Sequence, residues 1–259
     1  MDKILAEQSI GPKNTEISEK PIEENGDNVD LTLIRHSKPE YLDMVVGKRF
    51  DEVVQLLSQG VLEKSGIEHP EGFQIAQEVG QDLKEKQIIP DLIISSPANR
   101  AMETAILVAG EITKEHQQTH QIPITLESSF SELTPEFESI QEAYNKVEKE
   151  LSNPGVISTP NEARLIFRTA IDIWFRENLP AIEARVDLAI DRLRTLSMEH
   201  HASRVLVVSH GIILSVIRAR LQGQDIASII SEDPISYCNG FNADFDNESG
   251  LVIVKKETK

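Results

Sequence analysis

The chain has 259 residues, with 26 Lys and Arg against 43 Asp and Glu, and its formal net charge is −17. This acidic balance argues against nucleic acid as a partner, because duplex-binding proteins carry a basic patch, and no apolar run approaches the roughly 20 residues of a membrane span. Cys238 is the single cysteine, so no intrachain disulfide can form, and we expect a cytoplasmic protein in a reducing compartment.

The chain begins with a polar, mostly acidic stretch, residues 1–28, which we expect to be a flexible tail. From Val29 onward, apolar runs of strand character alternate with segments of helical periodicity. We predict strands over 29–34, 91–95, 124–126 and 204–209. We predict helices over 73–83, from Ser96 and Pro97 through 109, over 181–196 and over 211–217.

Two regions are less regular. Residues 133–175 are broken by prolines, and we expect a largely helical excursion over the sheet there. Residues 247–250 have the composition of a turn in a C-terminal hairpin.

Strand–helix alternation predicts an α/β fold: three layers, α/β/α, with a mainly parallel central sheet and helices on both faces. We expect residues 29–259 to form a single catalytic domain, with 133–175 as a helical insertion over the active site.

Three of the predicted strands are followed by similar polar and basic residues. Arg35-His36-Ser37 follows the first, Ser95 to Arg100 follows the second, and Ser209-His210-Gly211 follows the last. Parallel strands place their carboxyl ends at one edge of the sheet, which is where open α/β proteins bind ligands. Two arginines and two histidines therefore converge at that edge.

Such a cluster suits a tetrahedral dianion. Guanidinium groups grip phosphoryl oxygens with paired hydrogen bonds, and helices that begin near Ser96 and Gly211 add backbone donors. One imidazole can attack as a nucleophile while the other donates a hydrogen bond.

These residues resemble the three signatures of the histidine phosphatase superfamily, which includes the cofactor-dependent phosphoglycerate mutases. The signatures are Leu33 to Ser37, Ser95 to Ala105, and Val207 to Gly211, and the resemblance covers about residues 29–245. It implies that His36 is phosphorylated during the reaction. It also implies that Arg35 and Arg100 bind the phosphoryl group and that His210 completes the pocket.

The resemblance further implies a carboxylic acid that protonates the leaving oxygen. Glu132, in Phe130-Ser131-Glu132-Leu133, fits that place, and Glu136 is the alternative. We expect an acidic to neutral pH optimum, because this residue has to be protonated to act as the acid. No metal or cofactor is required by this chemistry.

The sequence departs from the mutase pattern. Ser37 stands where many members have Gly, and Lys38-Pro39-Glu40 differs from the mutase sequence. We also do not find the adjacent basic pair that mutases use to hold a second phosphate or carboxylate. We therefore expect a phosphomonoesterase that acts on a small phosphorylated metabolite or a phosphoprotein, with Ser37 and Lys38 contributing to substrate binding.

Two alternatives stay open: a phosphoglycerate mutase-type phosphotransferase, and a catalytically weak phosphate-binding or docking module. Neither the substrate nor the oligomeric state follows from the sequence. Residues 38–72 and 133–175 are expected to set specificity, and Lys48 and Arg49 are further candidates for contact with a second anionic group.

A looser pattern of Arg168, Trp174, Asn178 and Arg185 resembles one phosphatase branch, with Asn178 in place of a Ser. Trp174 is more readily interpreted as a packing residue than as a platform for the substrate.

Overall fold

A computed structural model describes residues 28–114, 121–133, 142, 144–147, 149, 155–229, 235–246 and 252–255. Within them, six strands form one sheet in the order β3-β2-β4-β1-β5-β6. The strands are β1 (Asn28–Arg35), β2 (Leu92–Ser95), β3 (Ile124–Leu126), β4 (Arg204–Ser209), β5 (Gly240–Asp246) and β6 (Val252–Val254). Most of the expected tail, the turn at 247–250 and Glu136 lie outside the described residues.

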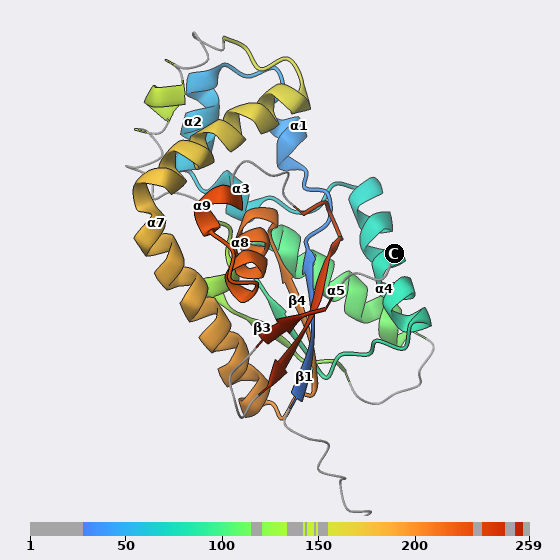
Figure 1. The fold of residues 1–259 in the computed structure, drawn as a ribbon. Coiled ribbons are helices and arrows are strands. Elements are labelled where there is room, and N and C mark those ends of the chain that lie inside the picture. Colours follow the sequence, from blue (N-terminus) through green and yellow to red (C-terminus); the bar gives the residue numbers. More distant parts are fainter. Residues whose placement is uncertain are drawn as a thin grey trace, which may run out of the picture.

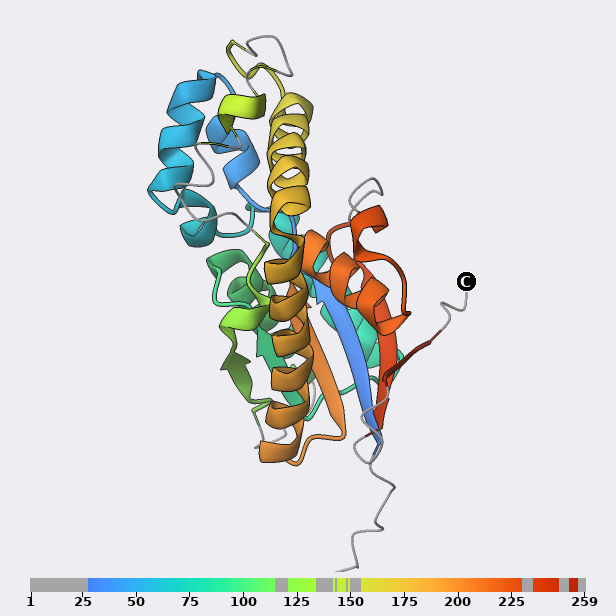
Figure 2. The same ribbon diagram turned by 60° about the vertical axis from the view of Figure 1, so that its left-hand side comes forward.

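The first four strands run parallel, and β5 and β6 add an antiparallel edge. Helices cover both faces, with α4 and α5 on one side and α8 and the second half of α7 on the other (Figures 1 and 2). The helices are α1 (Tyr41–Val45), α2 (Phe50–Ser58), α3 (Val61–Lys64), α4 (Glu71–Glu85), α5 (Asn99–Thr113), α7 (Pro160–Glu199), α8 (Gly211–Leu221) and α9 (Ile226–Ile229), with a 3₁₀ turn, η1 (Ser128–Phe130). The predicted three-layer fold is confirmed.

Side chains of β1 show why the sheet is covered on both faces. Leu31 and Leu33 belong to the apolar cluster formed with α7 and α8, whereas Ile34 belongs to the cluster formed with α4 and α5. Successive residues of a strand point to opposite faces, so a run of apolar residues must be buried on both sides.

The long helix α7 differs from the prediction. It begins at Pro160, where Thr159 and Glu162 form a capping box, so the predicted helix over 181–196 is only its second half. Asn178 has non-helical backbone angles (φ −122°, ψ 18°). The kink follows from Pro180, which cannot donate a backbone hydrogen bond and clashes with the preceding turn.

The two halves of α7 pack in different apolar clusters. Its first half packs Ala163 and Ile166 against Val45, Phe50 and other residues of α1 and α2 in a cluster of its own. This helical unit lies beyond the end of the sheet at which β1 and β4 terminate (Figure 1). The sequence did not predict α1, α2 or α3. The expected helical excursion over 133–175 therefore supplies only part of this helical unit. No helix in the described part of the chain is long and apolar enough to cross a membrane.

Candidate active site

The sheet register brings the predicted site residues together. Arg35 is paired with Ser209 across β1 and β4, so the segments that carry His36 and His210 leave the sheet side by side. Arg100 lies in the first turn of α5, which follows β2. His36, Arg100 and His210 are 2%, 4% and 0% exposed, so the site is a buried cluster of basic side chains.

The guanidinium of Arg100 contacts both imidazoles. Its Nε donates to Nε2 of His36 at 3.1 Å, and its Nη2 is 3.1 Å from Nδ1 of His210. The two imidazole rings meet edge to face, with centroids 4.9 Å apart. One cation therefore spans the two rings that the sequence assigned to the phosphoryl site.

The tautomer of His36 follows from its contacts. Nδ1 lies 2.6 Å from the carbonyl oxygen of Ser37, and a carbonyl can only accept, so Nδ1 carries the proton and Nε2 holds a lone pair. Burial, assisted by the charges of Arg100 and Arg35, holds the pKa of His36 well below 6.5. His36 is therefore a neutral imidazole with Nε2 available as a nucleophile.

His210 is held by Ser96. Its Nε2 lies 2.8 Å from the Ser96 hydroxyl, and because its Nδ1 accepts from Arg100, Nε2 carries the proton. Burial, followed by the charge of Arg100, also lowers the pKa of His210 well below 6.5. The predicted start of the helix at Ser96 was wrong, because α5 begins at Asn99. The Ser96 hydroxyl accepts from the Ala98 amide at 3.3 Å and also contacts His210.

Arg35 is held between the Tyr237 ring and the start of α8, and its Nε has no acceptor among the described residues. Its Nη1 donates to the carbonyl of Ile235 at 2.7 Å, and its Cζ lies 4.1 Å from the centroid of the Tyr237 ring. A Cβ on Gly211 would lie 3.1 Å from Cζ, so the absence of a side chain there lets the guanidinium pack against the start of α8. Nε of Arg35 is buried, and no acceptor in the described part of the chain reaches it, as expected of a group that binds an anion.

Glu132 follows η1 in the chain and lies beside the first turn of α8. Its Oε1 accepts from the backbone amides of Leu133 at 3.1 Å and Ile213 at 3.2 Å. Ile213 is three residues from His210, so the carboxylate is near the same edge of the sheet. Arg185 of α7 donates to the Ser131 carbonyl at 2.7 Å; burial lowers the pKa of Arg185, and the charge of Glu132 opposes this shift. The proton-donor role of Glu132 stays a prediction.

Ser37 is committed to the scaffold of the site. Its hydroxyl donates to the Gly72 carbonyl at 2.6 Å, and its amide donates to the Thr104 hydroxyl at 3.0 Å. Cys238 lies nearby, and burial raises the pKa of its thiol to about 11. A contact of Ser37 with substrate stays a prediction.

Lys38 forms ion pairs with two carboxylates. Its Nζ lies 2.6 Å from Glu68 and 2.7 Å from Glu71, which offsets its charge locally. Arg49 is exposed and pairs with Asp51 at 3.1 Å. These contacts give no support to a second anion site at either position, and the substrate-binding role of Lys38 stays a prediction.

Sequence reasoning missed the aromatic and hydroxyl residues around the basic cluster. Tyr237 contacts Arg35, and the ring centroid of Tyr41 lies 5.6 Å from Cζ of Arg100. Burial raises the pKa of Tyr41, against the charge of Arg100. Thr104 belongs to the second signature, Ser95 to Ala105, but its hydrogen bond to Ser37 joins residues 67 positions apart. Trp174 packs against the apolar clusters on both sides of the kink, as expected of a packing residue.

Comparison with known proteins identifies the family. The model of the histidine phosphatase superfamily (branch 1) matches residues 69–248, and the chain belongs to this superfamily. The matched region contains Arg100 and His210 but begins after Arg35 and His36, so the first motif depends on the geometry given above. A search of curated protein sequences found no match.

Solved structures share the fold. A phosphoglycerate mutase from Bacillus anthracis str. Sterne aligns over 90% of this chain and 93% of its own, with 18% identity and a TM-score of 0.57. A putative alpha-ribazole-5'-P phosphatase from Escherichia coli K-12 aligns over 88% and 94%, with 18% identity and a TM-score of 0.51. The alpha-ribazole phosphatase from Shigella flexneri aligns over 89% and 96%, with 18% identity and a TM-score of 0.51.

Proposed function

We propose that the chain is a metal-independent phosphomonoesterase that transfers a phosphoryl group first to His36 and then to water. The observation that carries this proposal is the protonation of His36: Nδ1 donates to Ser37, and Nε2 faces the donors of Arg100. A neutral imidazole held in this way is a nucleophile, and it lies among cations that can hold a phosphoryl group.

In the first step, Nε2 of His36 attacks phosphorus in line and the bond to the ester oxygen breaks. Glu132 gives its proton to the departing alkoxide, an effect typically worth about 10²–10⁴-fold in rate. In the second step, water attacks the phosphohistidine, the Glu132 carboxylate takes its proton, and the N–P bond breaks to release inorganic phosphate. Arg35 and Arg100 hold the non-bridging oxygens throughout.

Binding of a phosphate dianion has to rearrange the site. Arg100 donates to both imidazoles in this structure. When a phosphate dianion binds, its oxygens replace the imidazole nitrogens as acceptors of those hydrogen bonds. Nδ1 of His210 accepts a hydrogen bond here, and a nearby dianion raises the pKa of an imidazole. His210 therefore takes up a proton as the dianion binds and donates it in a hydrogen bond to a phosphoryl oxygen.

Hydrolysis of p-nitrophenyl phosphate by the purified full-length chain tests the proposal. His36→Ala is expected to lower kcat by at least about 10³-fold, as loss of a nucleophile does elsewhere. His200→Ala, at the exposed end of α7, is the matched control and keeps wild-type turnover. Wild-type-like turnover by His36→Ala would show that His36 is not the nucleophile.

The substrate class that we propose is a small phosphorylated metabolite or a phosphoprotein. The departure of Lys38-Pro39-Glu40 from the mutase sequence supports a phosphatase over a mutase, which needs a second anion site. A screen of phosphorylated metabolites and phosphopeptides, with and without a bisphosphate primer, tests this choice. Turnover that depends on the primer would favour the mutase.

A further inference from the structure

Four residues of the site are joined in a closed ring of hydrogen bonds. Arg100 Nε donates to His36 Nε2 at 3.1 Å, and His36 Nδ1 donates to the Ser37 carbonyl at 2.6 Å. The Ser37 amide donates to the Thr104 hydroxyl at 3.0 Å, and that hydroxyl donates to the Arg100 carbonyl at 2.7 Å. Each member donates to the next, so all four bonds have the same sense around the ring.

Thr104 closes the ring, and only a hydroxyl can do so at this position. The side chain has to accept from Ser37 and donate to Arg100 at the same time, which valine, of the same shape, cannot do. Thr104 is 0% exposed, so water does not replace either bond in the folded protein. Bonds that share one sense polarise one another and strengthen the set.

We propose that Thr104 is a positioning residue that fixes the tautomer of His36, an inference that rests on the proposed function. Its hydroxyl accepts from the amide of Ser37, and the carbonyl of the same residue, on the other side of its Cα, accepts from Nδ1 of His36. The proton is thereby kept on Nδ1, and Nε2 keeps its lone pair toward the phosphoryl group. The Ser37 hydroxyl, which donates to the Gly72 carbonyl at 2.6 Å, anchors the same residue through its side chain.

The ring also couples the nucleophile to its phosphate clamp. His36 follows β1, whereas Arg100 and Thr104 lie one turn apart on α5, so the hydroxyl ties the end of a strand to the helix that carries the clamp. Loss of the hydroxyl leaves the Ser37 amide buried without an acceptor. We expect the Ser37 backbone to shift, so that its carbonyl no longer holds the proton on Nδ1 and the proton of His36 exchanges between the two ring nitrogens.

The test compares Thr104→Val, which removes the hydroxyl, with Thr104→Ser, which keeps it. Thr113→Val is the matched control: Thr113 is the last residue of the same helix and makes the same type of bond, to the Ala109 carbonyl at 2.9 Å, whereas Arg100 lies in the first turn. Two quantities are measured in the full-length chain: kcat and KM on p-nitrophenyl phosphate, and the ¹⁵N chemical shifts of the His36 ring.

Thr104→Val is expected to lower kcat by about 10- to 100-fold with little change in KM, the scale of a misplaced reacting group. Its ¹⁵N shifts should show loss of the single Nδ1–H tautomer. Thr104→Ser should keep both properties, and Thr113→Val should match the wild type.

The proposal is overturned if Thr104→Val keeps wild-type kcat, or loses kcat while His36 remains wholly in the Nδ1–H form. If Thr104→Val does not fold, Thr104→Ala takes its place, because an alanine side chain can neither donate nor accept; wild-type kcat in that variant overturns the proposal equally. If the wild type does not hydrolyse the ester, the proposed function fails by itself, and the ¹⁵N shifts of the variants still decide whether Thr104 sets the tautomer.

Discussion

Substitution of Gly211 by alanine should impair the site without unfolding the protein. A Cβ at Gly211 would lie 3.1 Å from both Cζ and Nε of Arg35. The guanidinium cannot retreat freely, because Nη1 is bonded to Ile235 at 2.7 Å and Cζ lies 4.1 Å from the Tyr237 ring centroid. Arg35 therefore has to move by at least the difference between 3.1 Å and ordinary contact, which begins at 3.4 Å.

The magnitude follows from that displacement. If a misplacement of about 1 Å costs about 100-fold in rate, a shift of about 0.3–0.5 Å costs about four- to tenfold in kcat/KM. Stability changes little, because alanine in a helix gains about 0.5–1 kcal/mol over glycine and a strained Arg35 rotamer costs about 0.5–1.5 kcal/mol. The two terms nearly cancel.

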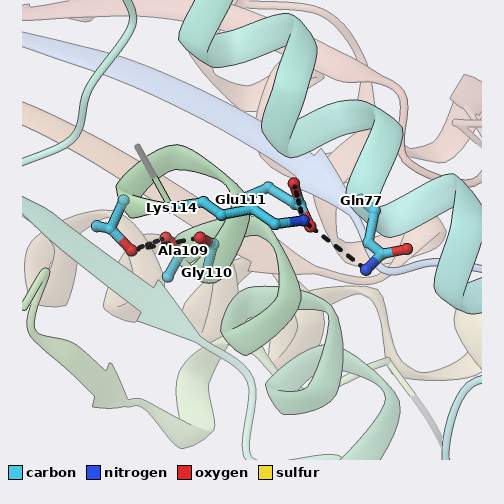
Figure 3. Close-up of polar contacts among 6 residues, drawn as sticks. Gln77, Ala109, Gly110, Glu111 and Lys114 are labelled. Atoms are coloured by element: carbon cyan, nitrogen blue, oxygen red, sulfur yellow. Dashed lines mark hydrogen bonds and ion pairs between the residues drawn. The ribbon is translucent and has the colours of Figure 1, made fainter. Parts of the chain in front are cut away.

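The assay is kcat/KM on p-nitrophenyl phosphate, together with thermal unfolding. Gly110→Ala in α5 is the control, because a Cβ there meets nothing within 4 Å; it should raise stability by about 0.5–1 kcal/mol and leave kcat/KM unchanged. Figure 3 shows Gly110 next to Ala109, near the contact of Lys114 with Glu111. Wild-type kcat/KM in Gly211→Ala would refute the packing of Arg35 described here.

Three further predictions concern the support of the site and the scaffold. Ser96→Ala removes the hydroxyl that lies 2.8 Å from Nε2 of His210 and should lower kcat by about tenfold, with the Ser96→Thr variant retaining more activity in the same assay. Gly80→Ala places a Cβ 2.7 Å from Cβ of Glu111, at the contact of α4 with α5, and should lower the free energy of unfolding by about 1–3 kcal/mol; unchanged urea denaturation would contradict this. Folding lowers the pKa values of His36 and His210 below 6.5, so the unfolded chain binds more protons than the folded chain below that pH. The free energy of unfolding should therefore have its full value above pH 6.5 and fall as the pH drops below 6.5. His36→Asn should reduce that slope below pH 6.5, and an unchanged slope there would show that His36 does not contribute.

The fold and the centre of the site could be predicted because both depend on short-range patterns. Apolar runs fixed the parallel strands, and a parallel sheet aligns their ends, so Arg35, His36, Arg100 and His210 converge without proximity in sequence. The register of β1 with β4, which pairs Arg35 with Ser209, confirms that argument at the level of single residues.

The remainder could not be predicted because it depends on contacts between distant segments. The polar residue Ser96 has the sequence character of a helix cap, but its hydroxyl is used by His210, 114 positions away. Tyr237 carries no periodic signal, and its contact with Arg35 exists only once β5 pairs with β1. One signal was available and overlooked: the Thr-Pro-x-Glu pattern at Thr159, which is a capping box at the start of α7.

The central claim is that His36 becomes covalently phosphorylated. Rapid acid-free quenching of the full-length chain during turnover of p-nitrophenyl phosphate, followed by peptide mass spectrometry, tests it most directly. The account predicts an acid-labile phosphoryl group on the peptide that contains His36, absent from the His36→Ala variant. Steady turnover with phosphate on a different residue, or with no phosphoenzyme at any time point, would contradict it.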